Sequence, residues 1–103
     1  MAIQNTLVTD STASSIFTSS GANAVTTVHI ANFTGSTVTA NVFVVPSGSS
    51  AGNSTVIYMN YSITSYNTLV IDSEKFILNN GDAIMANCST ANSLTATVSS
   101  IGI

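Results

Sequence analysis

The sequence predicts an all-β domain, an antiparallel β-sandwich of jelly-roll type with about eight strands. Three observations indicate this fold. β-branched residues dominate the segments between clusters of Gly, Ser and Asn, the clusters recur roughly every 8–12 positions, and helix-start signals are almost absent. Because the 103 residues contain no linker, internal repeat or change in composition, we expect one domain spanning residues 1–103.

Eight segments have the composition of strands. They are residues 3–9, 14–18, 24–33, 37–45, 55–63, 67–72, 83–88 and 93–99. Turn-forming residues separate them at 19–23, 34–36, 46–54 and 79–82. The segment 72–78 differs, because Ser73 could cap a short helical turn there.

The segment 24–45 has the pattern of a β-hairpin. A three-residue loop, 34–36, would pair Phe33 with Thr37 and place Val28 opposite Val42. Side chains alternate between the two faces of a strand, so this register gives one apolar face that we expect to be in the core. That face consists of Val28, Ile30, Val38, Ala40, Val42 and Val44.

The opposite face of this hairpin is also apolar, since it would carry Val25, Phe33, Phe43 and Val45. Either a second layer of the domain, or the 46–54 loop, covers this face, or another protein chain does. Tyr58 lies in a strand that is apolar on both faces and raises the same question.

The end of the chain raises a related question. After a regular alternation over 94–99, the sequence finishes with Ile101 and Ile103. Either a bulge at 99–100 turns these side chains into the core, or they dock on a neighbouring subunit. One Lys and one Pro must also protect every edge strand. Together these features predict a homo-oligomer or larger assembly, with interface residues Val25, Phe33, Phe43, Val45, Tyr58, Ile101 and Ile103.

The composition excludes several kinds of partner. Charged residues make up 5% of the chain and the net charge is −3, which cannot supply the cations needed for nucleic-acid or acidic-lipid binding. Polar character comes instead from 17 Ser, 15 Thr and 11 Asn. The longest apolar run, 42–46, falls far short of the ~20 residues of a membrane helix, and no signal peptide is visible. We therefore expect synthesis in the cytoplasm and no membrane partner.

Catalytic and metal-binding groups are scarce, so we expect no enzyme activity, cofactor or metal. His29 lies in mid-strand without a nearby acid, and Cys88 shares its strand face with Ile84 and Ala86, as a buried residue would. One cysteine and one histidine cannot form a disulfide framework or a structural zinc site. The remaining alternative is a calcium site, or a pair of catalytic carboxyl groups, formed from Asp72, Glu74 and Asp82.

Three tyrosines offer a different binding hypothesis. Tyr58, Tyr61 and Tyr66 could stack on sugar rings while the abundant Asn and Ser side chains bond the sugar hydroxyls. The alternative is that they are core or interface aromatics with a hydrated hydroxyl group.

Several segments together resemble small virion structural proteins of tailed phages, of the kind common in marine phages and cyanophages. The resemblance lies in the segments 25–36, 42–48, 67–72, 80–84 and 89–92, which read VTTVHIANFTGS, VFVVPSG, NTLVID, NGDAI and STAN. It implies a β-sandwich that helps to build a phage particle. The expected function is a capsid decoration or cement protein in the virion, bound to the major capsid protein or to tail proteins. The alternatives are a tail, collar or fibre component and a glycan-binding adhesion module.

Overall fold

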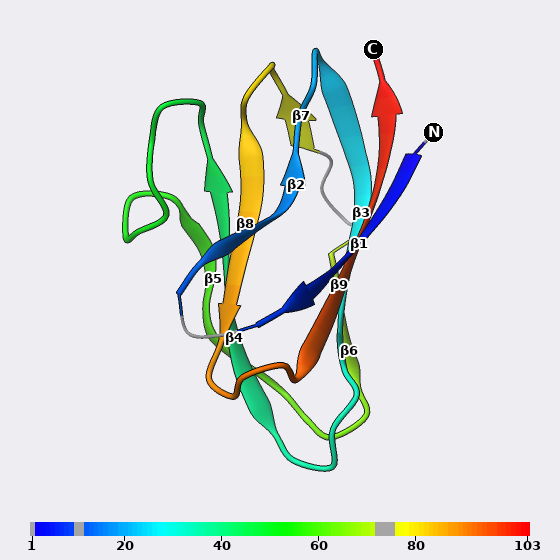
Figure 1. Cartoon of the computed structure of the whole chain (residues 1–103), viewed down its shortest axis with the longest axis vertical. Helices are drawn as coiled ribbons and strands as arrows, with labels where there is room; N and C mark the ends of the chain where they lie inside the picture. Colours follow the sequence, from blue (N-terminus) through cyan, green and yellow to red (C-terminus); the bar gives the residue numbers. More distant parts are fainter. Residues whose placement is uncertain (1, 10–11, 72–75) are drawn as a thin grey trace.

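The computed structural model describes residues 2–9, 12–71 and 76–103, which form two antiparallel sheets packed face to face (Figure 1). The strands are β1 (Ala2–Val8), β2 (Ser14–Thr18), β3 (Asn23–Asn32), β4 (Val38–Val45), β5 (Val56–Ile63), β6 (Thr68–Ile71), β7 (Phe76–Leu78), β8 (Ala83–Cys88) and β9 (Leu94–Gly102). Sheet A has the order β1-β9-β3-β6, and β7 also pairs with β3. Sheet B has the order β2-β8-β4-β5.

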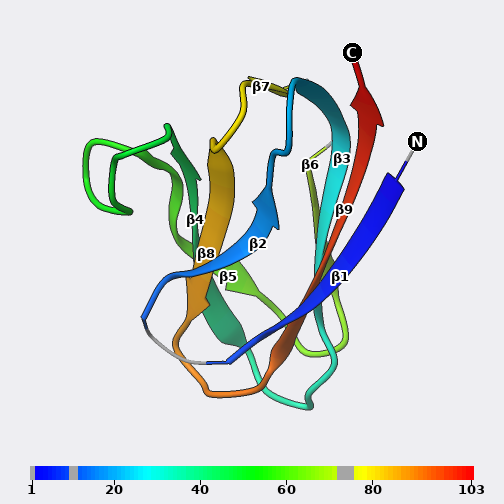
Figure 2. The ribbon, with the colours of Figure 1, turned by 45° about the horizontal axis from the view of Figure 1, so that its top comes forward.

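The strand order is that of a long hairpin rolled into two layers. β1 pairs with β9, β2 with β8, β3 with β6 and β7, and β4 with β5. Two further pairings, β3 with β9 and β4 with β8, close the roll. Figures 1 and 2 show the resulting sandwich, with both chain termini at the same end. The prediction of an antiparallel sandwich of jelly-roll type is confirmed.

Each predicted strand begins within one residue of an observed strand. The difference is β7, which occupies 76–78, where we expected part of a short helical turn. The rest of that expected turn, including Ser73, lies outside the described residues. The described residues therefore form nine strands, one more than the eight predicted segments.

The predicted pairing of 24–33 with 37–45 is wrong, because β3 and β4 lie in different sheets. The buried side chain of Asn32 explains the crossover. Its Nδ2 donates to the backbone oxygens of Ser36 (2.7 Å) and Ile63 (2.9 Å), and its Oδ1 accepts from the backbone nitrogen of Thr34 (3.0 Å). These bonds turn the chain out of sheet A and fasten it to the end of β5.

The hydrophobic face predicted for that hairpin is nevertheless mostly buried. Val28 and Ile30 of β3, and Val38, Ala40 and Val42 of β4, are at most 1% exposed, while Val44 is half-buried against the core. They come from opposite sheets, so they contact one another across the sandwich and not along a shared strand pair.

Val25 is a second correction, since it lies in the core at 1% exposure and not on an outer face. The register between β3 and β9 shifts between Val25 and Thr27, which makes Thr26 the extra residue of a β-bulge. Thr26 Oγ1 donates to the backbone oxygen of Ser99 (3.1 Å). The bulge places Val25 on the same face as Val28.

We predict that Asn32→Ala lowers the free energy of unfolding by about 2–3 kcal/mol, because it leaves buried backbone groups of the crossover without partners. Asn32→Asp should cost at least as much, since a carboxylate would face the carbonyl oxygens of Ser36 and Ile63. Urea unfolding measures both. Asn53→Ala, in the exposed 46–55 loop, is the matched control, and an equal cost at both positions would contradict this role of Asn32.

Candidate interaction surface

The outer face of sheet A is defined by four rows of side chains that the strand register places side by side. From the ends of β1 and β9 nearest the chain termini, the rows are Ile101–Ala24–Ile77, Ile3–Ser99–Thr27, Asn5–Thr97–His29–Val70 and Leu7–Thr95–Ala31–Thr68. In each row, residues directly opposite each other on neighbouring strands point to the same side of the sheet.

The central and the flanking strands of sheet A place side chains of different size on this outer face. The two central strands, β9 and β3, contribute mainly Thr, Ser and Ala, with His29 among them. The flanking strands contribute the larger aliphatic side chains. Those that are substantially exposed are Ile3 (68%), Leu7 (44%), Val70 (43%) and Ile77 (62%), with Ile101 (38%) at the end of β9. Short hydroxyl-bearing side chains therefore lie between two aliphatic borders.

The described residues of this face include no Asp, Glu, Lys or Arg. Within the described ranges, Asp82 is the only Asp, Glu, Lys or Arg, and it lies in the turn before β8, which belongs to sheet B. The other four charged residues, Asp10, Asp72, Glu74 and Lys75, fall outside the described ranges. Among the described residues, the polar side chains on the outer face of sheet A are thus hydroxyls and amides together with the imidazole of His29.

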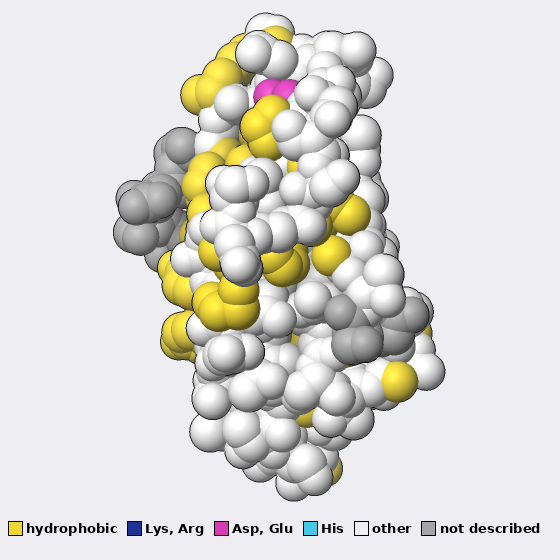
Figure 3. Space-filling view, turned by 90° about the vertical axis from the view of Figure 1, so that its left-hand side faces the viewer, with side chains coloured by type: hydrophobic (Ala, Val, Ile, Leu, Met, Phe, Trp, Pro, Cys, Tyr) yellow, Lys and Arg dark blue, Asp and Glu magenta, His cyan; other side chains and the backbone are white. Residues whose placement is uncertain are grey.

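Two of the predicted interface residues, Phe43 and Val45, are buried within the chain, at 5% and 4% exposure. They lie on the side of β4 that faces away from the core, where Phe43 stands between Met85 of β8 and Val56 of β5. Figure 3 shows this side of the molecule, on which white polar and backbone atoms separate several hydrophobic patches. Of the two explanations open for this face, cover from within the same domain is the one that the burial supports.

The C-terminal isoleucines do not turn into the core. β9 continues its alternation, so Ser100 faces inward and Ile101 faces outward, because the bulge at this position lies in β3 and not in β9. Ile103 is 69% exposed, and its backbone nitrogen donates to the backbone oxygen of Ala22 (3.0 Å). Of the remaining predicted interface residues, Phe33 is 49% exposed and Tyr58 is half-buried.

The tyrosines are only partly brought together. The rings of Tyr58 and Tyr61 meet edge to face, with centroids 5.6 Å apart, and Tyr58 packs against the core. Asn60 between them has a positive φ of 52°, and its backbone nitrogen donates to Oδ1 of Asn41 (2.6 Å). Tyr66 lies in the turn after β5, beside Gly35, so its ring belongs to a different part of the surface.

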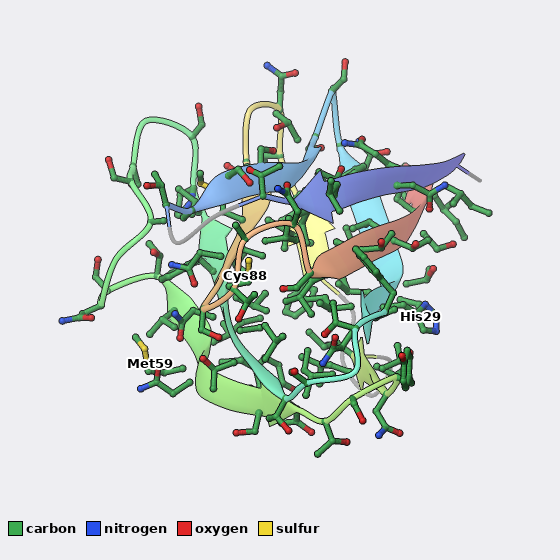
Figure 4. All side chains as sticks on the ribbon, turned by 60° about the horizontal axis from the view of Figure 1, so that its bottom comes forward. His29, Met59 and Cys88 are labelled. Atoms are coloured by element: carbon green, nitrogen blue, oxygen red, sulfur yellow. The ribbon has the colours of Figure 1, made fainter. Side chains whose placement is uncertain are left out.

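His29 and Cys88 occupy opposite environments, as Figure 4 shows. His29 is exposed and points away from the sandwich, whereas Cys88 is buried between the sheets at 3% exposure with Ile84 and Ala86. The Cys88 thiol donates to the backbone oxygen of Thr90 (2.9 Å). The burial of Cys88 confirms its prediction, and His29 lies in the middle of a strand, β3, as predicted.

Asp82 joins three loops at one end of the sandwich. Its Oδ1 accepts from the backbone nitrogen of Ser47 (2.8 Å) and its Oδ2 from that of Asn79 (2.9 Å), while its backbone oxygen accepts from the backbone nitrogen of Ser19 (2.8 Å). The bonds from Ser47 and Asn79 favour the carboxylate and lower the pKa of Asp82 below its usual value. Asp72 and Glu74, the other members of the predicted acidic site, lie outside the described residues.

We predict that Asp82→Asn destabilises the protein at pH 6 and that the difference from the parent shrinks as the pH falls. A carboxyl group with a lowered folded-state pKa stabilises the fold above its unfolded pKa of about 4 and stops doing so as it is protonated. Urea unfolding at pH 6 and pH 3 measures the change. The remaining acids titrate in both proteins and cancel in the comparison, so an equal difference at both pH values would contradict this role of Asp82.

No helix in the described ranges is long and apolar enough to span a membrane, and no group of three or more His, Cys, Asp or Glu side chains in those ranges could hold a metal ion. No protein-family model matches the chain, and no curated protein or solved structure shows significant similarity to it.

Proposed function

We propose that this protein is a non-enzymatic structural component of a phage particle, a capsid decoration or cement protein, and that it contacts its neighbours through the outer face of sheet A. The observation that carries the proposal is the pair of aliphatic borders on this face. Exposed Ile, Leu and Val side chains lie in register on β1, β6 and β7, and no described charged side chain lies among them.

The size of this face supports a specific protein contact. Four strand widths of ~4.8 Å and nine residues of ~3.3 Å give a flat area on the order of 600 Å² before side-chain relief is added. A standard interface buries about 800 Å² on each partner. One sheet face is therefore close to the area that a stable contact requires, and repetition over a symmetric shell would multiply its strength.

The chemistry of the face also fits a contact that is buried permanently. Burying a charged side chain at an interface carries a desolvation cost that its new partners often fail to repay, whereas aliphatic side chains gain free energy when they leave water. The Thr and Ser hydroxyls of the central strands can bond to a partner backbone or to trapped water. A tail, collar or fibre component would use the same chemistry, so position in the particle is a separate question.

That question is answered by the copy number of the protein in a purified virion. A capsid decoration protein should be present in hundreds of copies, and a tail, collar or fibre component in a few dozen at most. Quantitative mass spectrometry against the major capsid protein measures the ratio.

The glycan-binding alternative has less support. Tyr58 is packed against the core and Tyr66 belongs to a different loop, so the three tyrosines do not form one stacking platform. A monomeric protein with a strong signal on a glycan array would favour this alternative over assembly.

We predict that Val70→Lys weakens assembly at least about tenfold, because it introduces a charge that the contact must desolvate. Light scattering of the purified protein and sedimentation with capsids measure the loss. Ile57→Lys is the matched control, since Ile57 has nearly the same exposure (41% against 43%) but lies on β5 of sheet B. Equal assembly by the parent and by Val70→Lys would contradict the use of this face. Phe43 is unsuited to this test because a charge there would be buried within the chain.

We also predict that the oligomeric mass and the capsid-bound fraction are unchanged between 0.1 M and 1 M NaCl. Salt weakens contacts between charges, and the described residues of the proposed contact include no Asp, Glu, Lys or Arg. Light scattering at the two concentrations is the measurement, and dissociation at high salt would show that charged residues outside the described face hold the assembly together.

A further inference from the structure

The strands at the edges of the two sheets differ in how well they are protected against pairing with another chain. β2 shifts register between Ser15 and Phe17, and β5 shifts register twice, with Asn60 in a positive-φ conformation between its two tyrosines. β6 and β7 are four and three residues long. Bulges and short strands are the usual ways in which proteins prevent edge-to-edge pairing.

β1 has none of these features within the described residues. It pairs with β9 over seven consecutive positions, from Ala2 opposite Ser100 to Val8 opposite Leu94, without a register shift. Its sequence, AIQNTLV, contains no charge, proline or glycine. Figure 2 shows β1 along the outer border of sheet A, and no other strand of the described residues pairs with its outer edge. The free edge of β1 is therefore a regular template for an added strand.

We propose that this edge binds β1 of a second copy of the protein, antiparallel, about a two-fold axis through Asn5. The inference rests on the proposed assembly role and names one contact through which assembly occurs. In this register Ile3 lies opposite Leu7 of the second copy, Gln4 opposite Thr6, and Asn5 opposite Asn5. The same pairs occur twice, as an isologous contact requires.

The order of side chains along β1 is what favours a second copy over another extended segment. The strand reads nearly the same in both directions by residue type, with an aliphatic residue at each of positions 3 and 7 and polar residues between them. Ile3 and Leu7 are 68% and 44% exposed and point to the outer face of sheet A, so the pairing would place two aliphatic cross-strand contacts there. No like charges meet at the axis.

The paired edge would also extend the candidate interaction surface. Two copies of sheet A would join into one continuous sheet, and the β1 border of each outer face would meet the β1 border of the other. The Ile3 and Leu7 side chains that border each single face would then become the middle of a double-width face. This continuity links the edge contact to the contact proposed for the outer face.

The test is disulfide cross-linking in a Cys88→Ser background. Asn5→Cys places two cysteines directly opposite each other at the axis, within the Cα separation of about 4.4–6.8 Å that a disulfide requires. Ile3→Cys alone puts its two copies four residues apart, ~13 Å along the strand, which is too far. We expect Asn5→Cys to form covalent dimers at least about tenfold faster than Asn53→Cys, an exposed loop control. Ile3→Cys should cross-link only when it is mixed with Leu7→Cys.

Dimers are measured on non-reducing gels, and circular dichroism confirms that each variant is folded. The inference is overturned if Asn5→Cys is no faster than Asn53→Cys, or if Ile3→Cys alone is as fast as Asn5→Cys. If Asn5→Cys fails to cross-link while Val70→Lys still weakens assembly, the edge contact is wrong and the proposed function stands. If Asn5→Cys cross-links while Val70→Lys leaves capsid binding unchanged, the edge contact stands and the outer-face function is wrong.

Discussion

The pairing of β3 with β9 is the interaction on which the rest of the structure depends. It runs from Asn23 opposite Gly102 to Asn32 opposite Leu94, and it closes a long hairpin into a sandwich. The bulge at Thr26 within this pairing decides that Val25 enters the core and that Ile101 remains outside. β1 can join sheet A only along the free side of β9, so its exposed edge is also a consequence. The outer face of sheet A and the β1 edge therefore have one structural origin.

The positions of the strands could be predicted from the sequence, but their partners could not. Alternation with period two and clusters of turn residues are local signals, and they place the starts of the eight predicted strands within one residue, although they miss β7. A three-residue connection such as 34–36 has the same local signal whether it joins neighbours in one sheet or crosses between sheets. The crossover depends on Asn32, whose amide reaches Ile63, 31 residues away. A contact of that range has no signature in the local pattern.

The candidate surface was predicted in chemical character and only partly in its residues. Ile101, Ile103 and Phe33 are exposed as an interface would require, whereas Val25, Phe43 and Val45 are buried. The exposed residues that were missed are Ile3, Leu7, Val70 and Ile77. The first three lie in strands with apolar residues on both faces, so parity alone cannot say which face meets the core. Ile77 lies in β7, where a helical turn was expected. The sequence did contain partial signals of their exposure. Val70 alternates with Leu69 and Ile71, so it points to the opposite face from them, and Ile3 and Leu7 point to the opposite face from Val8.

The scarcity of charge acts differently on the surface and on the ends of the sandwich. On the surface, few charges mean weak electrostatic repulsion between copies, so the free protein must rely on strand geometry to avoid association. β2, β5, β6 and β7 have such geometry and β1 does not. At the end of the sandwich where three loops meet, the carboxylate of Asp82 accepts hydrogen bonds from the backbone nitrogens of Ser47 and Asn79 and so holds their two loops together. The regular β1 edge and the aliphatic-bordered outer face both belong to sheet A, and both are uncovered. In a chain with little charge, the capacity for association is therefore concentrated on this sheet. Contacts with neighbours are therefore expected to be directional.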